Sequence, residues 1–163
     1  MSHAEANTAA EAAMTDLARV ARHLTGENPT CLICSPTRPE SLKLRATGFA
    51  DGVLTAEFTA NKDQEGGPGY VHGGVLAGAI DEVFGGAAFT AGSIAVTGNL
   101  NIDYRRPVEL HTRAIITAKV DSVDGRKVSV SGQLRLGGEN GPLAITARGL
   151  FVQVKPSHFK FGP

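Results

Sequence analysis

The sequence has few cysteines, no long apolar run and no excess of charge of one sign. Each of these shortages excludes some classes of protein. It has no tryptophan and only two cysteines among 163 residues. No apolar run reaches about 18 residues, the length that a membrane-spanning helix needs. Its 16 Lys and Arg balance 16 Asp and Glu, so no basic excess indicates a nucleic acid or an anionic membrane as the main partner.

The N-terminus also lacks the features of a targeting segment. No basic stretch followed by an apolar one begins the chain, which argues against export. Residues 3–11 carry two acids, Glu5 and Glu11, and no Lys or Arg, unlike a mitochondrial transit peptide. We therefore expect a cytoplasmic protein.

The length and composition suit one domain. At 163 residues, 42% of them hydrophobic, the chain has material for one ordinary core and too little for two. Helical periodicity over residues 8–24, ending near Gly26, predicts an N-terminal amphipathic helix within residues 1–26. The domain is expected over residues 27–155, and residues 156–163 are expected to form a C-terminal tail.

Alternating apolar residues predict about six strands around one hydrophobic helix. Residues 42–46 and 54–58 alternate on either side of an Asp51-Gly52 turn, which predicts a hairpin. The later strands are expected at residues 94–104, 114–120, 128–136 and 143–154. This pattern favours an α+β fold in which an antiparallel sheet wraps around the helix. A second copy is expected to pair with an exposed sheet edge.

The central helix carries an acid where its sequence is otherwise apolar. From Gly74 to Phe89 the residues are apolar or tiny on nearly every side, which predicts a helix buried all round. Asp81 is the anomaly, because a buried carboxylate is costly and burial raises its pKa toward the range of a general base. Small residues surround it on the helix, namely Ala77, Gly78 and Gly85.

The start of the same helix offers backbone donors. Gly73 and Gly74 lie where a helix leaves its first N–H groups unpaired and its dipole positive. Such groups can polarise a carbonyl and hold the oxyanion formed on attack, which is worth about 3 kcal/mol per donor. Gly73 and Asp81 are eight residues apart, about 12 Å along one helix. Because both groups need to reach one carbon, the predicted site combines the Gly73 of one subunit with the Asp81 of another in a two-fold dimer.

These residues carry a family resemblance. The chain has Gly-Gly-Pro-Gly-Tyr-Val-His-Gly-Gly-Val-Leu at residues 66–76, then Asp81-Glu82, Thr97, and Asn-Ile-Asp-Tyr-Arg-Arg-Pro-Val at residues 101–108. It resembles the hotdog-fold acyl-CoA thioesterases, in the phenylacetyl-CoA-thioesterase-like branch, from about Cys31 to Val154. The resemblance implies hydrolysis of an acyl-CoA thioester by a homodimer or homotetramer.

The resemblance also implies roles for single residues. Gly73 matches the residue whose N–H polarises the thioester carbonyl, and Asp81 matches the acid that activates water or attacks directly. His72 matches the loop histidine of the family, and Thr97 the hydroxyl that helps to hold the water. Many members have Asn or Gln shortly before the histidine, where Glu65 is the nearest replacement in this chain.

Further residues are candidates for substrate binding. Strict alternation puts Thr97 on one strand face with Asn99 and Asn101, a polar lining for a cleft. The basic pairs Arg105-Arg106 and Arg126-Lys127 suit the phosphates of CoA, and Gly74 is expected to assist Gly73.

Cys31 and Cys34 form a CxxC motif. A structural zinc site needs about four ligands, and no second CxxC or HxxxH follows. We expect two reduced thiols in a loop, no metal, and no cofactor beyond the CoA of the substrate. Two other functions remain open: a hotdog hydratase or dehydratase using His72 and Asp81, and a non-catalytic acyl-CoA-binding module.

Overall fold

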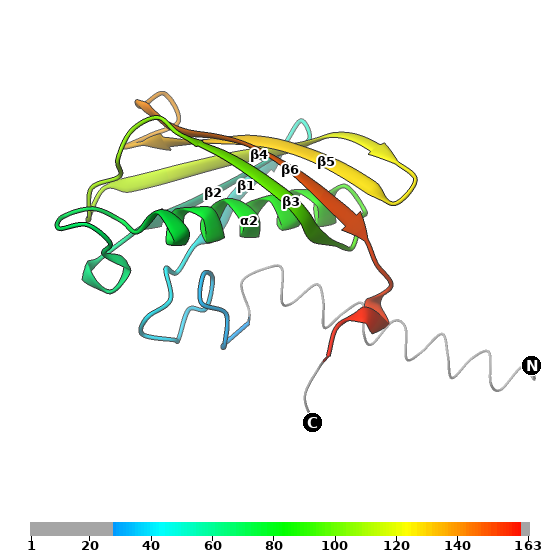
Figure 1. The fold of residues 1–163 in the computed structure, drawn as a ribbon, viewed down its shortest axis with the longest axis horizontal. Helices are drawn as coiled ribbons and strands as arrows, with labels where there is room; N and C mark the ends of the chain where they lie inside the picture. The colour runs from blue at the N-terminus through cyan, green and yellow to red at the C-terminus, as the bar shows by residue number, and fades with distance from the viewer. Residues whose placement is uncertain (1–27, 161–163) are drawn as a thin grey trace, which may run out of the picture.

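The structure, a computed structural model, describes residues 28–160. The predicted N-terminal helix and the last three residues of the predicted tail lie outside the described residues. The described chain contains a six-stranded antiparallel sheet and an 18-residue helix, α2 (Gly73–Thr90). In Figure 1 the helix lies along one face of the sheet, and the segment from residue 28 to the first strand lies beyond the helix. The predicted α+β arrangement is confirmed.

The strands follow the predicted order closely. They are β1 (Arg45–Ala50), β2 (Val53–Thr59), β3 (Ala95–Tyr104), β4 (Arg113–Asp124), β5 (Lys127–Leu136) and β6 (Leu143–Gln153), with two short 3-10 helices, η1 (Lys62–Gln64) and η2 (Pro156–His158). The sheet order is β1-β2-β4-β5-β6-β3, so β1 and β3 form its edges. No helix among residues 28–160 is both long enough and apolar enough to cross a membrane.

The β1–β2 hairpin has the predicted turn, but its first strand starts later than predicted. Asp51 and Gly52 have φ values of 52° and 76°, as a two-residue turn with both central residues left-handed requires. The first strand begins at Arg45, later than predicted, because Lys43 has a φ of 56° and interrupts the extended chain. Leu42 and Leu44 nevertheless lie in the core.

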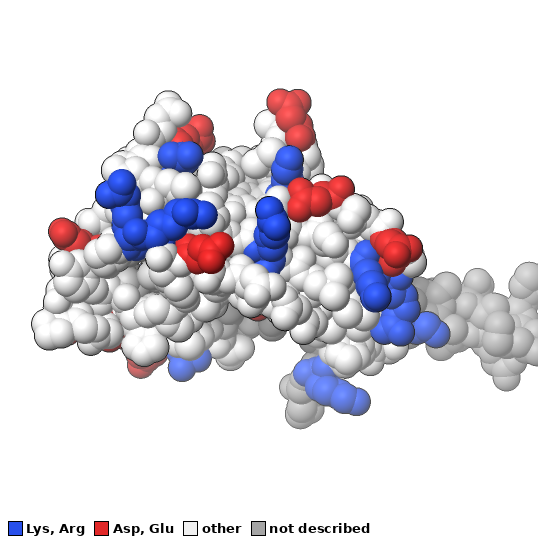
Figure 2. Space-filling view, turned by 45° about the horizontal axis from the view of Figure 1, so that its top comes forward, with Lys and Arg blue, Asp and Glu red and all other residues white. Residues whose placement is uncertain are grey.

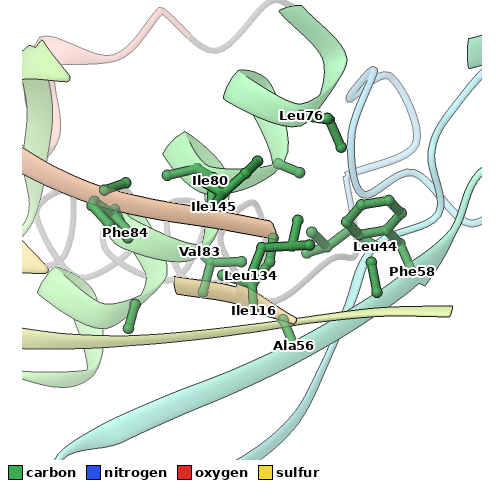
Figure 3. Close-up of a cluster of buried hydrophobic side chains, with 14 of the residues drawn as sticks. Leu44, Ala56, Phe58, Leu76, Ile80, Val83, Phe84, Ile116, Leu134 and Ile145 are labelled. Atoms are coloured by element: carbon green, nitrogen blue, oxygen red, sulfur yellow. The ribbon is translucent and has the colours of Figure 1, made fainter. Parts of the chain in front are cut away.

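The core lies between α2 and the sheet, as Figure 3 shows for its central side chains. Phe84 is fully buried and packs against the sheet where β5 and β6 carry glycines. A Cβ on Gly132 would lie 2.6 Å from the Phe84 ring, and one on Gly149 would lie 3.0 Å from it. The two glycines therefore form a recess that receives the ring.

The prediction that α2 is buried on every side is wrong for the single chain. The sheet covers one face, where Ile80, Val83 and Phe84 are almost fully buried, while Asp81 and Glu82 are half-buried. Part of the opposite side contacts the segment before β1, because the Ile33 side chain would lie 2.9 Å from a Cβ at Gly78. This small residue near Asp81 thus makes room for the chain's own loop.

Candidate active site

The start of α2 leaves one backbone donor without a partner. His72 is the N-cap, and its Nδ1 accepts the Gly74 N–H at 2.9 Å. The His72 carbonyl accepts the N–H groups of Val75 and Leu76 at 3.0 and 3.1 Å. Of the first four helical N–H groups, only that of Gly73 has no acceptor within residues 28–160. Gly73 is therefore the donor that a ligand can reach, whereas the Gly74 N–H is already bound.

This cap fixes the chemical state of the histidine. Because Nδ1 accepts a hydrogen bond, the neutral ring carries its proton on Nε2. The His72 N–H donates to the Gln64 carbonyl at 2.8 Å. The buried Gln64 side chain in turn donates to the Glu40 carbonyl and accepts from the Asn61 N–H. The sequence analysis missed Gln64, because it took the adjacent Glu65 as the replacement for the Asn or Gln that many members have before the histidine.

Tyr104 is a second residue that sequence reasoning missed. Its hydroxyl, at the end of β3, donates to the Gly73 carbonyl at 2.8 Å. Burial raises the pKa of Tyr104, so the phenol keeps the proton that it donates. A Cβ on Gly73 would lie 3.9 Å from this ring, an ordinary contact distance. The tyrosine thus holds the first turn of α2 against the edge strand.

The predicted acid and hydroxyl meet eight residues further along the helix. Thr97 Oγ1, near the start of β3, donates to Asp81 Oδ1 at 2.5 Å. No other hydrogen bond from a described residue reaches the Asp81 carboxylate, so Oδ2 is left to accept a proton from a ligand or water. The sequence predicted this association only through the family resemblance.

The predicted strand face for Thr97 is wrong. The register pairs Thr97 with Phe151 and Asn99 with Leu150, leaving Gly98 as the extra residue of a bulge. Because paired residues share a face, Thr97 lies with buried Phe151 on the helix side. Asn99 and Asn101 lie on the other face and bond to each other at 2.7 Å. The bulge reverses the alternation that the sequence predicts.

The acid next to Asp81 on the helix, Glu82, has a raised pKa. Burial, the largest cause, and the nearby Cys31 and Asp81 together raise the pKa of Glu82 to about 7, against a lowering hydrogen bond from Cys34. Glu82 points to the loop before β1, where Cys31 lies 3.9 Å from its Oε2. Asp81 instead faces the edge strand through Thr97.

Glu65 is engaged within its own loop. Its Oε1 accepts the Gly69 N–H at 2.8 Å, and its Oε2 forms an ion pair with Lys62 at 2.6 Å. The ion pair, with help from the Gly69 hydrogen bond, lowers the pKa of this carboxyl. The structure thus gives Glu65 a part in holding the loop before His72.

The two basic pairs lie at opposite ends of the edge region. Arg105 and Arg106 border a hollow of about 220 Å³ that is also lined by Gly73 and Tyr104. Arg126 lies at the β4–β5 turn, where its Nε donates to the Gln153 carbonyl at 3.2 Å. Gln153 pairs with Ala95 at the start of β3, so this second pair belongs to the Asp81 end. Figure 2 shows Lys and Arg interleaved with Asp and Glu on the face it presents.

One chain therefore carries two separated half-sites. Gly73 is the first residue of α2 and Asp81 lies further along the same helix, about 12 Å away. Tyr104 contacts the first group and Thr97 the second, at opposite ends of β3. Each half lies along the same free edge of the sheet.

Comparison with known proteins gives a consistent family. Residues 68–142 match the thioesterase superfamily. The chain is 40% identical over 108 residues to the acyl-coenzyme A thioesterase THEM4 of Xenopus laevis, covering 66% of this chain and 48% of that protein. It is 38% identical over 107 residues to the Rattus norvegicus THEM4, covering 66% of this chain and 46% of that protein. The chain thus spans about half the length of these relatives.

Solved structures agree with the fold. The thioesterase superfamily protein RHA08564 superposes with a TM-score of 0.68 at 29% identity, covering 87% of this chain and 81% of that one. The Escherichia coli PaaI protein of the phenylacetic acid degradation operon superposes with a TM-score of 0.64 at 20% identity, covering 69% of this chain and 80% of that one. Together with the six-stranded sheet and α2, these findings show that the chain has the hotdog fold and that its residues 68–142 match the thioesterase superfamily.

Proposed function

We propose that this protein is an acyl-CoA thioesterase that hydrolyses its substrate to a free acid and CoA. One observation supports this most directly: α2 presents an unpaired N–H at Gly73 and, eight residues later, a carboxylate braced by Thr97. A thioester hydrolase needs these two functions, a donor for the carbonyl oxygen and an acid that delivers the nucleophile. The relatives named acyl-coenzyme A thioesterase support the substrate class.

In the proposed reaction the Gly73 N–H binds the thioester carbonyl oxygen. As the carbon is attacked, negative charge collects on this oxygen, and the N–H and the positive end of the α2 dipole stabilise it. His72 orients the first turn through Gly74 and offers its Nε2–H to the substrate. Hydrolysis of the C–S bond then releases the acid and the CoA thiol, with no step through a metal or cofactor.

At the other half-site, Asp81 delivers the nucleophile. The Thr97 hydroxyl donates its hydrogen bond to Oδ1, so its oxygen is left to accept a hydrogen bond from a water molecule. Asp81 Oδ2 accepts the other hydrogen as that water attacks. Direct attack by Oδ2 would instead break the C–S bond, expel the CoA thiolate and form an anhydride that water later cleaves. Either route requires the carboxylate form of Asp81.

A homodimer completes the site in this proposal. Both half-sites lie along β3, which has no neighbour on its outer side within the described chain. Antiparallel pairing of two copies through β3 brings the Asp81–Thr97 half of one copy to the Gly73–Tyr104 half of the other. The two-fold axis makes two equivalent sites. A tetramer is not required for either of them.

The bulge suggests the register of this pairing. Thr97 and Tyr104 pair with buried Phe151 and Ile145, so both face the helix side and suit positions opposite each other. A two-fold axis through Asn101, with Gly98 as the extra residue, gives this pairing. The same axis brings Arg126 and Lys127 of one copy toward Arg105 and Arg106 of the other, which concentrates positive charge for the CoA phosphates.

Release of the CoA thiol across a panel of acyl-CoA substrates tests the function. Steady thiol release with loss of the thioester supports hydrolysis. Binding without release would support the acyl-CoA-binding module, and reversible addition of water to an enoyl-CoA would support the hydratase. The His72 tautomer weighs against a hydratase, because a ring whose Nδ1 accepts from Gly74 has no free basic nitrogen.

A further inference from the structure

A cluster of three metal-ligating side chains lies outside the proposed active site. Cys31, Cys34 and Glu82 bring their sulfur and carboxylate atoms within 4.8 Å of one another. The two cysteines come from the loop before β1, and Glu82 comes from α2, 51 residues from Cys31. The cluster is enclosed, since Cys34 is only 5% exposed and the other two side chains are half-buried.

Backbone donors converge on the first sulfur. Cys31 Sγ accepts the N–H groups of Ile33 and Cys34, each at 3.4 Å. Hydrogen bonds of this kind stabilise a thiolate, which is the form that binds metal. They also fold the chain so that Cys31 and Cys34, three residues apart, bring their sulfur atoms close together.

The loop that carries the cysteines is internally braced. The buried Ser35 hydroxyl donates to the Pro29 carbonyl at 2.9 Å and accepts the Arg38 N–H at 2.9 Å. The Leu44 N–H donates to the Ile33 carbonyl at 3.0 Å. Ile33 itself packs on Gly78 of α2. The ligand positions are therefore held against the helix before any ion arrives.

The charge of the Glu82 carboxylate also favours a bound cation. No Lys or Arg of the described chain forms an ion pair with Glu82, although a half-buried carboxylate ordinarily needs a partner. Two thiolates and one carboxylate form a donor set that suits Zn²⁺, which binds Cys sulfur and Glu oxygen in tetrahedral sites. Three protein ligands leave the fourth position for water.

We propose that Cys31, Cys34 and Glu82 bind one Zn²⁺ ion that fastens the loop before β1 to α2. The ion joins segments that are far apart in sequence and lies one residue from Asp81, on a different side of the helix. The ion takes no part in the proposed hydrolysis, because the cluster faces the loop and not the β3 edge where the half-sites lie. This proposal does not depend on thioester hydrolysis.

Cobalt substitution of the full-length chain tests this site. The protein is reduced, stripped of metal with a chelator, loaded with Co²⁺ and dialysed. We expect one Co²⁺ per chain, with the sulfur-to-cobalt charge-transfer absorption and the strong visible bands of a tetrahedral thiolate site. Zn²⁺ should displace the Co²⁺ and remove both features. Elemental analysis should then find one Zn²⁺ per chain.

Variants separate this site from adventitious binding. Cys31→Ser and Cys34→Ser should abolish the charge-transfer absorption, and Glu82→Gln should weaken Zn²⁺ binding by about tenfold or more. Asp81→Asn is the matched control, because it removes the adjacent carboxylate of the same helix and should bind Co²⁺ like the wild type. Circular dichroism checks that each variant is folded.

Two results would overturn the proposal. One is a reduced, folded wild-type chain that retains no Co²⁺ or Zn²⁺ after dialysis, with both thiols free in a thiol titration. The other is equal metal retention by the wild type and both serine variants.

Discussion

The Thr97 hydroxyl donates to Asp81 at 2.5 Å because a bulge at Gly98 turns Thr97 toward the helix. In a regular strand Thr97 would lie on the same face as Asn99. Without the bulge, Thr97 would therefore face away from α2. The bulge therefore sets the geometry of the acid. It is the local irregularity on which the proposed nucleophile depends.

Asp81→Asn should nearly abolish thiol release. The amide keeps the volume and can still accept a hydrogen bond from Thr97, but it neither takes a proton from water nor attacks. A loss of about 10²-fold to 10⁴-fold in kcat is expected for a general base. Asp51→Asn, in the exposed β1–β2 turn, is the control and should retain wild-type kcat. An active, folded Asp81→Asn enzyme would remove this acid from the mechanism.

Thr97→Val should lower kcat while Thr97→Ser retains most of it. Valine has nearly the same shape as threonine but lacks the hydroxyl. A hydrogen bond to a charged group is worth about 1.5–3 kcal/mol, which corresponds to about tenfold to 150-fold in rate. Steady-state kinetics of the folded variants measure this. Equal rates for valine and wild type would show that the hydroxyl is dispensable.

Gly73→Pro should remove the proposed carbonyl donor without breaking the helix. Proline suits the first helical position, and His72 has φ −59° and ψ 131°, values that a residue before proline adopts. Loss of one oxyanion donor lowers kcat by about 10²-fold to 10³-fold. Gly73→Ala keeps the N–H and meets the Tyr104 ring at an ordinary distance, so it should lose less. A folded proline variant with wild-type kcat contradicts the assigned role.

Mixing two inactive variants should restore activity if the site combines two subunits. In a dimer of Gly73→Pro with Asp81→Asn, one site collects both changes and the other collects neither. Random exchange at equal amounts makes about half of the dimers mixed, so about one quarter of wild-type activity should return. Mass-tagged subunits verify the exchange. Verified mixed dimers without recovered thiol release would place both groups of each site in one chain.

The proposed strand register is tested by cross-linking. Opposite residues of antiparallel strands have Cα atoms about 4.5–5.5 Å apart, within the range of a disulfide. Asn101→Cys should therefore form a disulfide between two copies under mild oxidation, visible as a dimer on a non-reducing gel. Asn99→Cys lies about 13 Å from its counterpart in this register and should not. A dimer with Asn99→Cys and none with Asn101→Cys would require another register.

The fold could be predicted from the sequence because its signals are local. Alternating residues marked the strands, and the apolar run after Gly74 marked α2. The errors came from backbone conformations that composition does not reveal. Lys43 has a φ of 56° and delays the first strand, and the Gly98 bulge shifts the face of Thr97. A glycine inside a strand is compatible with either a regular or a bulged conformation, so sequence did not decide between them.

The site was predictable only where neighbours in sequence form it. The free N–H of Gly73 follows from its position at a helix start. The contacts of Tyr104 with Gly73 and of Glu82 with Cys31 join segments 31 and 51 residues apart, and no spacing rule reports them. For the same reason the sequence analysis did not single out Glu82, the acid that the loop before β1 covers and whose pKa is raised.

The recess formed by Gly132 and Gly149 has a mechanical consequence. In the proposed dimer each α2 carries a donor for one site and an acid for the other. The helix therefore fixes the distance between these two groups. Sliding it along its axis would bring one group closer to its carbonyl and carry the other away. Because Phe84 packs into the recess between the two glycines, such a shift would require this buried ring to leave its place, and the core packing opposes it.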